Sequence, residues 1–406
     1  MKIGIVYPYD MSRGSGVGEI VYASQAELRR RGHDAVIITP RPLSYDGPDP
    51  DRDHMIFIGA STDFNSPLNT MVQVSASVNA TIEEVLAREK FDILHFHEPW
   101  IPFLSRQILS RSKCVNVATF HATLPNTPMS RTVIKAVTPY TKSIIKYIDE
   151  FTAVTESAAE YVCTMTDAPV AIIPPGIDLK KYQPPTRRSD GKEQKTIFYV
   201  GRLENRKGVK YLLEAFKVLQ TKKPEVSLVI AGVGPDRDKL EAQAEQLELQ
   251  NVSFVGYISD EQKIKYLHES DLFCAPALYG ESFGVVLLEA MATGLVTVAG
   301  NNVGYASVLK GLGAISLVSP KDTEEFARRL DLLLHESSLR RLWRNWAKDE
   351  LPQYDYARIV DQYEEVYEQA YGRHAARKKR LLRLPGRRKF GKKKTQKIKK
   401  KSRIAA

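Results

Sequence analysis

Two hydrophobic patterns alternate along most of the chain. Short apolar runs, such as residues 115–120 and 272–275, are typical of buried strands, whereas the stretches between them carry apolar residues at helical spacing. This alternation favours mostly parallel sheets with helices on both faces. The expected strands lie at residues 2–7, 35–39, 92–96, 115–120, 151–154, 170–173, 196–200, 226–231, 252–255, 272–275, 296–299 and 314–317.

Two kinds of segment interrupt the alternation. Residues 41–82 hold a loop rich in Pro and Asp and then an uncharged stretch, so we expect an insertion of loops and short strands there. The proline-rich segments 174–178 and 182–185 are typical of a hinge. The predicted fold class is therefore α/β, with two doubly wound, Rossmann-like domains that face an interdomain cleft.

The length of 406 residues suits two domains with additional segments. The expected divisions are an N-terminal domain at 1–175, a C-terminal domain at 176–353, a C-terminal helix at 354–372 that crosses back to the first domain, and a basic tail at 373–406.

The net charge of +11 comes from one end of the chain. Residues 373–403 contain 17 Lys and Arg and no Asp or Glu, so of 59 basic residues 42 remain for the other part of the chain, against 48 acidic ones. Such a tail cannot collapse, and we expect it to be disordered. Its expected partner is an anionic membrane surface, with nucleic acid as the alternative.

Composition also bounds the compartment. Three widely spaced cysteines favour reduced thiols over a disulfide framework. Residues 1–6 are too short an apolar run for a signal peptide, and no stretch is long and apolar enough to cross a membrane. We therefore expect a cytoplasmic protein, peripheral at the inner face of the membrane.

The segment Gly280-Glu281-Ser282-Phe283-Gly284 carries the strongest chemical signal. It forms a tight turn before an apolar helix, and a second carboxylate, Glu289, follows eight positions after Glu281. Eight helical positions would place both carboxylates on one face of a small cup with helix-start amides in its floor. Carboxylates accept from sugar hydroxyls and such amides donate to phosphate. The plain alternative is a strand-turn-helix junction with two solvated glutamates.

Two further pairs of charged residues each follow a predicted strand. In the loop at residues 201–208, Arg202 and Lys207 can converge on one anion such as a pyrophosphate, although a basic surface turn has the same pattern. Asp260 and Lys263 can read the donor and acceptor edge of guanine. Residues 259–262 also form a respectable helix capping box, and both interpretations can hold together.

Three histidines follow strands. His121 ends the run 115–120, and a lone histidine is more often structural than catalytic. Alternation places His95 and His97 on the same face of a strand end. A His-x-His pair can bind metal, but no third ligand is evident, so we expect no metal site.

Taken together, these motifs resemble the retaining glycosyltransferases of family 4, which have the two-domain GT-B fold. The resemblance covers about residues 1–372. Within the family, the best match is the phosphatidylinositol mannosyltransferase-like branch. The matching positions are Glu281 and Glu289, residues 201–208, 175–178, 120–121 and 280–292, Pro8-Tyr9, Gly16-Val17 and His97-Glu98-Pro99.

On the donor side, the resemblance implies that Glu281 holds the hexose hydroxyls beside the amides of Phe283 and Gly284, while Glu289 binds the ribose. The other donor-side roles fall to Arg202 and Lys207 at the departing diphosphate and to Asp260 and Lys263 at guanine.

On the other side of the cleft, the resemblance implies that the backbone at Gly16 approaches the phosphates and that His121 contacts the transferred sugar. Tyr9 and Trp100 would lie on the acceptor side. Gly18 and Trp100 depart from the branch, where we expect amide side chains, and the sequence leaves the acceptor open.

The predicted activity is retaining transfer of a hexose, mannose from GDP-mannose, to a lipid-linked or membrane lipid acceptor, without a metal or other cofactor. One alternative is a UDP-hexose-dependent transferase for a soluble or polysaccharide acceptor. A sugar-nucleotide epimerase would explain the 280–284 turn less well. An alternative of another class is a nucleic-acid-associated, non-catalytic protein on a transferase scaffold, which the acidic body disfavours.

Overall fold

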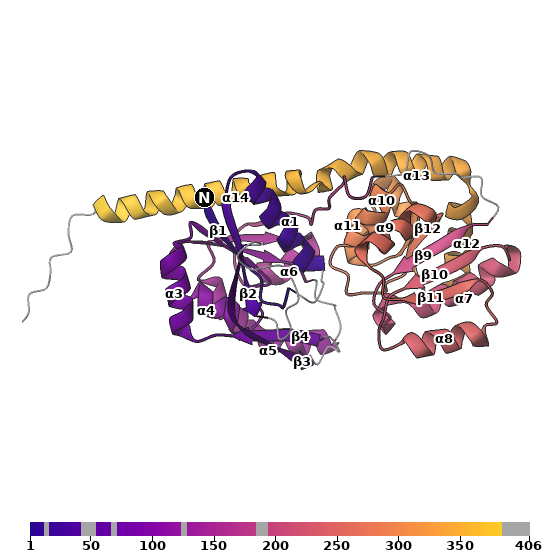
Figure 1. Cartoon of the computed structure of the whole chain (residues 1–406), viewed down its shortest axis with the longest axis horizontal. Helices are drawn as coiled ribbons and strands as arrows, with labels where there is room; N and C mark the ends of the chain where they lie inside the picture. Colours follow the sequence, from indigo (N-terminus) through magenta and orange to yellow (C-terminus); the bar gives the residue numbers. More distant parts are fainter. Residues whose placement is uncertain (12–15, 42–53, 66–70, 123–127, 184–193, 384–406) are drawn as a thin grey trace, which may run out of the picture.

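The computed structural model describes residues 1–11, 16–41, 54–65, 71–122, 128–183 and 194–383. Two α/β domains lie side by side, and one long helix runs along both of them (Figure 1). The two-domain α/β fold class is confirmed.

The N-terminal domain is built on an eight-stranded sheet with the order β4-β3-β2-β1-β5-β6-β7-β8. All its neighbours pair in parallel except β3 and β4, which form an antiparallel pair. Its strands are β1 (Lys2–Val6), β2 (Asp34–Arg41), β3 (Met55–Asn65), β4 (Met71–Ala76), β5 (Ile93–His97), β6 (Val115–Phe120), β7 (Glu150–Ala153) and β8 (Val170–Ile172). Its helices are α1 (Gly16–Arg30), α3 (Asn79–Glu89), α4 (Leu104–Leu109), α5 (Pro128–Ile145) and α6 (Glu156–Cys163).

The C-terminal domain has a six-stranded sheet, all parallel, with the order β11-β10-β9-β12-β13-β14. Its strands are β9 (Thr196–Val200), β10 (Ser227–Ala231), β11 (Val252–Gly256), β12 (Leu272–Ala275), β13 (Thr297–Gly300) and β14 (Leu317–Val318). Its helices are η1 (Asn205–Lys207), α7 (Val209–Lys222), α8 (Arg237–Gln246), α9 (Asp260–Glu269), α10 (Val285–Ala292), α11 (Val303–Val308), η2 (Gly311–Ser316), α12 (Thr323–His335), α13 (Ser337–Glu350) and η3 (Leu351–Tyr354).

The central strands of both sheets have the composition of buried parallel strands. Strands β5, β6 and β12 are buried along their whole length, as expected for strands covered by helices on both faces. In each sheet the strand order reverses, between β1 and β5 and between β9 and β12. Ligands of such sheets bind at the carboxyl ends of the strands beside that reversal.

The predicted insertion at residues 41–82 contains strands β3 and β4, which extend the sheet at its edge. We expected short strands, but β3 is 11 residues long. Its uncharged residues from Phe64 onward belong to the antiparallel ladder with β4, which satisfies backbone groups at that edge.

Helix α14 (Tyr356–Arg383) returns from the second domain to the first (Figure 1). The crossing was predicted, but the helix is longer than expected. Residues 373–383, which we assigned to the disordered tail, are helical, because strong helix formers such as Ala375 and Ala376 continue the pattern. Arg373 also pairs with Glu150 of the first domain. Residues 384–406 lie outside the described residues.

The two chain crossings between the domains lie side by side. The backbone N–H of Ile177 donates to the carbonyl of Tyr354 at 2.8 Å, and the N–H of Tyr356 donates to the carbonyl of Ile177 at 3.3 Å. A Cβ at Gly176 would lie 2.7 Å from the ring of Tyr356, so glycine is needed for this close approach.

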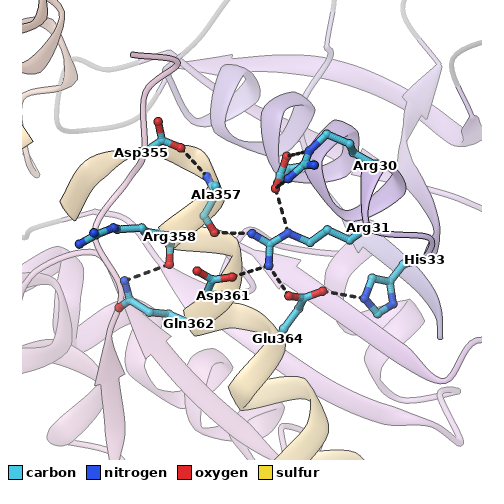
Figure 2. Close-up of polar contacts among 10 residues, drawn as sticks. Arg30, Arg31, His33, Asp355, Ala357, Arg358, Asp361, Gln362 and Glu364 are labelled. Carbon is cyan, nitrogen blue, oxygen red and sulfur yellow. Dashed lines mark hydrogen bonds and ion pairs between the residues drawn. The ribbon is translucent and has the colours of Figure 1, made fainter. Parts of the chain in front are cut away.

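Arg31 anchors α14 to the first domain (Figure 2). Its guanidinium lies 2.5 Å from Asp361, pairs with Glu364 as well, and donates to the carbonyl of Ala357 at 2.6 Å. Its Nε lies 2.8 Å from Glu27. The Arg31 side chain is only 17% exposed, so these charges are partly desolvated and depend on one another.

We expect Arg31→Ala to loosen this helix. The substitution removes the shared cation from two partly desolvated carboxylates, Glu27 and Glu364, and from the more exposed Asp361, which costs about 2–3 kcal/mol of stability. Hydrogen–deuterium exchange should rise across residues 357–371. Arg30 provides the matched control because it also pairs with Glu27 but is 68% exposed, so Arg30→Ala should leave the stability and the exchange of residues 357–371 nearly unchanged. Equal exchange in the two variants would contradict the anchoring role.

Candidate active site

Two cavities lie between the domains. The larger has a volume of about 910 Å³ and is bounded by the start of α6 on one side and by residues 278–281 and 301–303 on the other. The smaller, about 260 Å³, lies between α1 and the C-terminal domain and is lined by Glu19, Tyr22, Asp260 and Glu289, among others.

Glu281 reaches the larger cavity and is held by two cations. The Nζ of Lys207 lies 2.8 Å from its Oε1, and the guanidinium of Arg206 donates to the same oxygen at 2.6 Å. Arg206 also lies 2.7 Å from Glu204 and donates to the carbonyl of Gly280 at 3.2 Å. The sequence predicted Lys207 at the diphosphate, and its contact with Glu281 was not predicted.

The second predicted cation is not beside this glutamate. The Arg202 side chain is exposed, and no ion pair or hydrogen bond joins it to another described residue. Arg206, which we did not single out, takes the place beside Glu281. The tight 3₁₀ turn η1 brings Arg206 and Lys207 round to the glutamate, and nothing in the basic pattern of the loop distinguishes the two arginines.

Glu281 and Glu289 do not share one cup, contrary to our expectation. Helix α10 begins only at Val285, with Gly284 as its N-cap, so half of the eight-residue spacing is turn. Glu281 lines the larger cavity and Glu289 the smaller one. Gly284 has φ 116°, and a Cβ there would lie 2.7 Å from the ring of Tyr305, so the turn requires glycine. The neighbouring Phe283 is buried and packs edge-on against Tyr354.

Glu289 is the centre of a buried polar cluster. Only 4% exposed, it accepts from the hydroxyl of Tyr182 at 2.7 Å and from the Nζ of Lys263 at 2.8 Å. Lys263 also lies 3.3 Å from Asp260, which pairs with Lys181 at 2.9 Å. Burial opposes the charge of Lys263, but Glu289 outweighs it and raises the pKa of this lysine. The sequence indicated Asp260, Lys263 and Glu289, whereas it gave no signal for Lys181 and Tyr182.

Asp260 lies in the first turn of α9, as the capping pattern predicted. The Ser259 side chain accepts from the N–H of Gln262 at 3.3 Å, and the Gln262 side chain accepts from the N–H of Ser259 at 2.8 Å. Lys181 and Lys263 outweigh partial burial and lower the pKa of Asp260, so this carboxyl is ionised and able to accept hydrogen bonds.

His121 lies at the carboxyl end of β6 and is 5% exposed. Its Nε2 is 2.7 Å from Nδ1 of His97, and its backbone N–H donates to Glu98 at 2.8 Å. The rings of His95 and His97 are 4.4 Å apart, which confirms that they share a face. Burial lowers the pKa of His121 to about 3 and raises the pKa of Glu98 to about 7.

The sequence could not show that His121 meets the His-x-His pair, because the residues are far apart along the chain. Despite this grouping, no set of three or more His, Cys, Asp or Glu in the described part of the chain has the arrangement of a metal site.

The other predicted residues of the first domain lie near the same edge. Gly16 begins α1, and a Cβ there would meet nothing within 4 Å, which leaves space for a ligand. The ring of Tyr9 packs edge-on against Tyr7 at 5.3 Å. Trp100 packs against Tyr161, with ring centroids 5.3 Å apart, so much of its surface is used within the domain.

Two facing parallel sheets with a polar cleft between their carboxyl edges define the GT-B class of transferases. Residues 14–181 match the family described as Glycosyltransferase Family 4, and residues 185–350 match Glycosyl transferases group 1. The chain belongs to glycosyltransferase family 4 and is a retaining hexosyltransferase that uses a nucleotide-sugar donor.

Among its relatives is the phosphatidyl-myo-inositol mannosyltransferase of Mycolicibacterium smegmatis, 30% identical over 377 residues that cover 92% of this chain and 95% of the relative. The enzyme of the same name from Mycobacterium tuberculosis is 30% identical over 383 residues, 92% of this chain and 98% of the relative. Among solved structures, sucrose-phosphate synthase from Thermosynechococcus elongatus shares the fold, with a TM-score of 0.71 at 18% identity over 92% of this chain and 99% of that one. Within the described residues, no helix is both long and apolar enough to span a bilayer.

Proposed function

We propose that this protein transfers mannose, with retention of configuration, from GDP-mannose to a lipid acceptor at an anionic membrane surface. The observation that carries the donor assignment is the cluster in which Glu289, Tyr182 and Lys263 lie largely buried, with Asp260 and Lys181 at its exposed rim. In this cluster the Asp260 carboxylate can accept hydrogen bonds from a purine edge, and the Glu289 carboxylate can accept from ribose hydroxyls. Lys181 and Lys263 hold Asp260, and Lys263 also holds Glu289.

In this proposal Glu289 accepts hydrogen bonds from the ribose. Both of its described contacts are made by Oε1, so the second carboxylate oxygen remains for the ligand. Asp260 accepts from two adjacent donors of guanine, and Lys263 donates to the neighbouring acceptor edge. The base of UDP is uracil, which has a single ring N–H between two carbonyls. This pattern of donors and acceptors suits Asp260 and Lys263 less well.

The hexose and the diphosphate occupy the larger cavity. Glu281 accepts from the hexose hydroxyls, and the amides of Phe283 and Gly284 at the start of α10 face the phosphates. Lys207 and Arg206 neutralise the charge that develops as the diphosphate departs, and the exposed Arg202 can join them. With these cations in place the reaction needs no metal ion.

The first domain supplies the other wall. The open backbone at Gly16 approaches the diphosphate, and His121 contacts the hexose near its anomeric carbon. The attacking hydroxyl enters on the face from which the diphosphate leaves, and a phosphate oxygen takes its proton, so that the configuration is retained. Tyr9 and Trp100 lie on the acceptor side of His121.

A lipid acceptor is supported by the relatives, whose name specifies an inositol phospholipid. Gly18 and Trp100 depart from the amide side chains we expect in that branch, so we propose a lipid acceptor without assigning inositol to it. The basic residues from Arg373 onward would hold this cytoplasmic enzyme peripherally at the membrane. Each Lys or Arg close to an anionic bilayer adds about 1 kcal/mol, less as salt rises.

Nucleotide preference tests the donor assignment. Calorimetry should show GDP binding at least about tenfold more tightly than UDP, because paired buried polar contacts contribute roughly 1–3 kcal/mol. Asp260→Ala should reduce that preference, whereas Glu261→Ala, at the next and exposed carboxylate of the same helical turn, should preserve it. UDP binding as tightly as GDP would remove the case for GDP-mannose and favour a UDP-hexose.

Membrane attachment is tested by truncation after Arg383, which keeps α14 whole and removes 11 Lys and Arg. The truncated enzyme should hydrolyse the donor normally but no longer sediment with phosphatidylglycerol vesicles at physiological salt. Replacing Lys392–Lys394 and Lys399–Lys401 by Gln in the full chain should have the same effect. Equal sedimentation of all forms, or binding of the full chain to RNA but not to vesicles at matched salt, would contradict the attachment.

A further inference from the structure

Helix α14 makes a buried polar contact with the strand end that carries the predicted reaction-centre histidine. The hydroxyl of Tyr367 lies 2.6 Å from Nδ1 of His95, and Nε2 of the same ring lies 2.6 Å from the hydroxyl of Thr119. Thr119 in turn lies 2.5 Å from the hydroxyl of Thr152, which donates to the carbonyl of Ala118. These side chains are all buried.

The His95 ring is hydrogen-bonded at both of its nitrogens. His95 is neutral, because burial lowers its pKa to about 3, so one nitrogen donates and the other accepts. The hydroxyl of Thr119 also bonds Thr152 and Tyr363. With Nε2 donating to Thr119, Nδ1 accepts from the hydroxyl of Tyr367. Tyr367 thus holds the orientation of the His95 ring.

A ring contact and a hydrogen bond connect His95 to His121. The His95 ring packs against His97 at 4.4 Å, and His97 bonds His121 through Nδ1. The other nitrogen of His97, Nε2, is buried without a partner among the described residues. A buried N–H without an acceptor is more costly than an unpaired acceptor, so the proton of His97 lies on Nδ1 and is donated to Nε2 of His121. The proton of His121 is then on Nδ1, the nitrogen that does not bond His97.

We infer that Tyr367 is a positioning residue for hexosyl transfer: through His95 and His97 it holds His121 as a hydrogen-bond donor toward the cleft. The inference rests on the proposed place of His121 beside the transferred hexose. Helix α14 would then support the site as well as join the domains. If α14 left the first domain, the His95 ring would lose the contact with Tyr367 and no longer support His97 and His121.

The test compares Tyr367→Phe with Tyr371→Phe, the same chemical change one turn later on the same helix, where the side chain is 42% exposed. Tyr367→Phe should lower kcat for transfer about fivefold to tenfold, the scale of one buried hydrogen bond, with KM for the donor nearly unchanged. Tyr371→Phe should match wild type. Thr119→Val should resemble Tyr367→Phe, and Thr119→Ser, which keeps the hydroxyl, should restore turnover.

A second measurement does not depend on turnover. Nitrogen-15 NMR of the imidazoles should show His95 protonated on Nε2 and His121 on Nδ1 in the wild type. In Tyr367→Phe the resonances of His97 and His121 should broaden or shift, because the His95 ring that packs against them loses its fixed orientation. Unchanged kcat and unchanged His97 and His121 resonances in that variant would overturn the inference. If His121→Ala abolishes transfer while Tyr367→Phe is normal, the inference fails and the proposed function stands; if His121→Ala is fully active, both fail.

Discussion

The geometry of the enzyme depends on how the two sheets are kept with their carboxyl edges opposed. The chain passes between the domains at Ile177 and again at Asp355, and the two passages are joined by backbone hydrogen bonds. Helix α14 then continues onto the first domain, where Arg31 holds it through Asp361, Glu364 and the carbonyl of Ala357 (Figure 2). These hydrogen bonds tie the two crossings to one another between the domains.

Charge compensation is the second constraint. The cleft needs carboxylates to recognise hydroxyl groups, and carboxylates removed from water are costly unless cations accompany them. Glu281 is accompanied by Lys207 and Arg206, and Glu289 by Lys263 and Tyr182. In the proposed reaction Lys207 and Arg206 meet the diphosphate and Lys263 meets the base, so ligand binding redistributes existing ion pairs and creates few new ones. This arrangement ties the recognition of the sugar to the stabilisation of the leaving group.

Much of the fold could be predicted because a buried parallel strand has an apolar signature of its own. Strands β6, β9 and β12 begin and end at the predicted residues. Strand β14 was expected at 314–317, but the 3₁₀ helix η2 occupies most of that segment, since short apolar runs do not distinguish the two. The end of α14 was missed because basic residues suggest a solvated tail as readily as an exposed helical face.

At the candidate site, the sequence singled out Glu281 and Glu289, which line the two cavities between the domains, and Lys207, which pairs with Glu281. It did not identify Arg206, because neighbouring arginines in one loop differ only in where the turn directs them. Nor could it find Lys181, Tyr182 or the hydrogen bond between His97 and His121, which exist only once distant segments meet. A contact between segments that are far apart along the chain leaves no local pattern in the sequence. The partners of the predicted site residues could therefore be found only in the structure.

The most direct measurement is the turnover of Glu281→Gln with GDP-mannose, followed as GDP release and as mannosyl transfer. The account predicts that turnover falls about a hundredfold or more, the scale expected when a preorganised polar group is removed from the reacting centre. GDP affinity should not fall, since GDP has no hexose and the variant frees Lys207 and Arg206. Glu204→Gln, which removes the other carboxylate beside Arg206, should stay within about threefold of wild type. Near-normal turnover of Glu281→Gln would contradict the assignment of this cleft as the donor site.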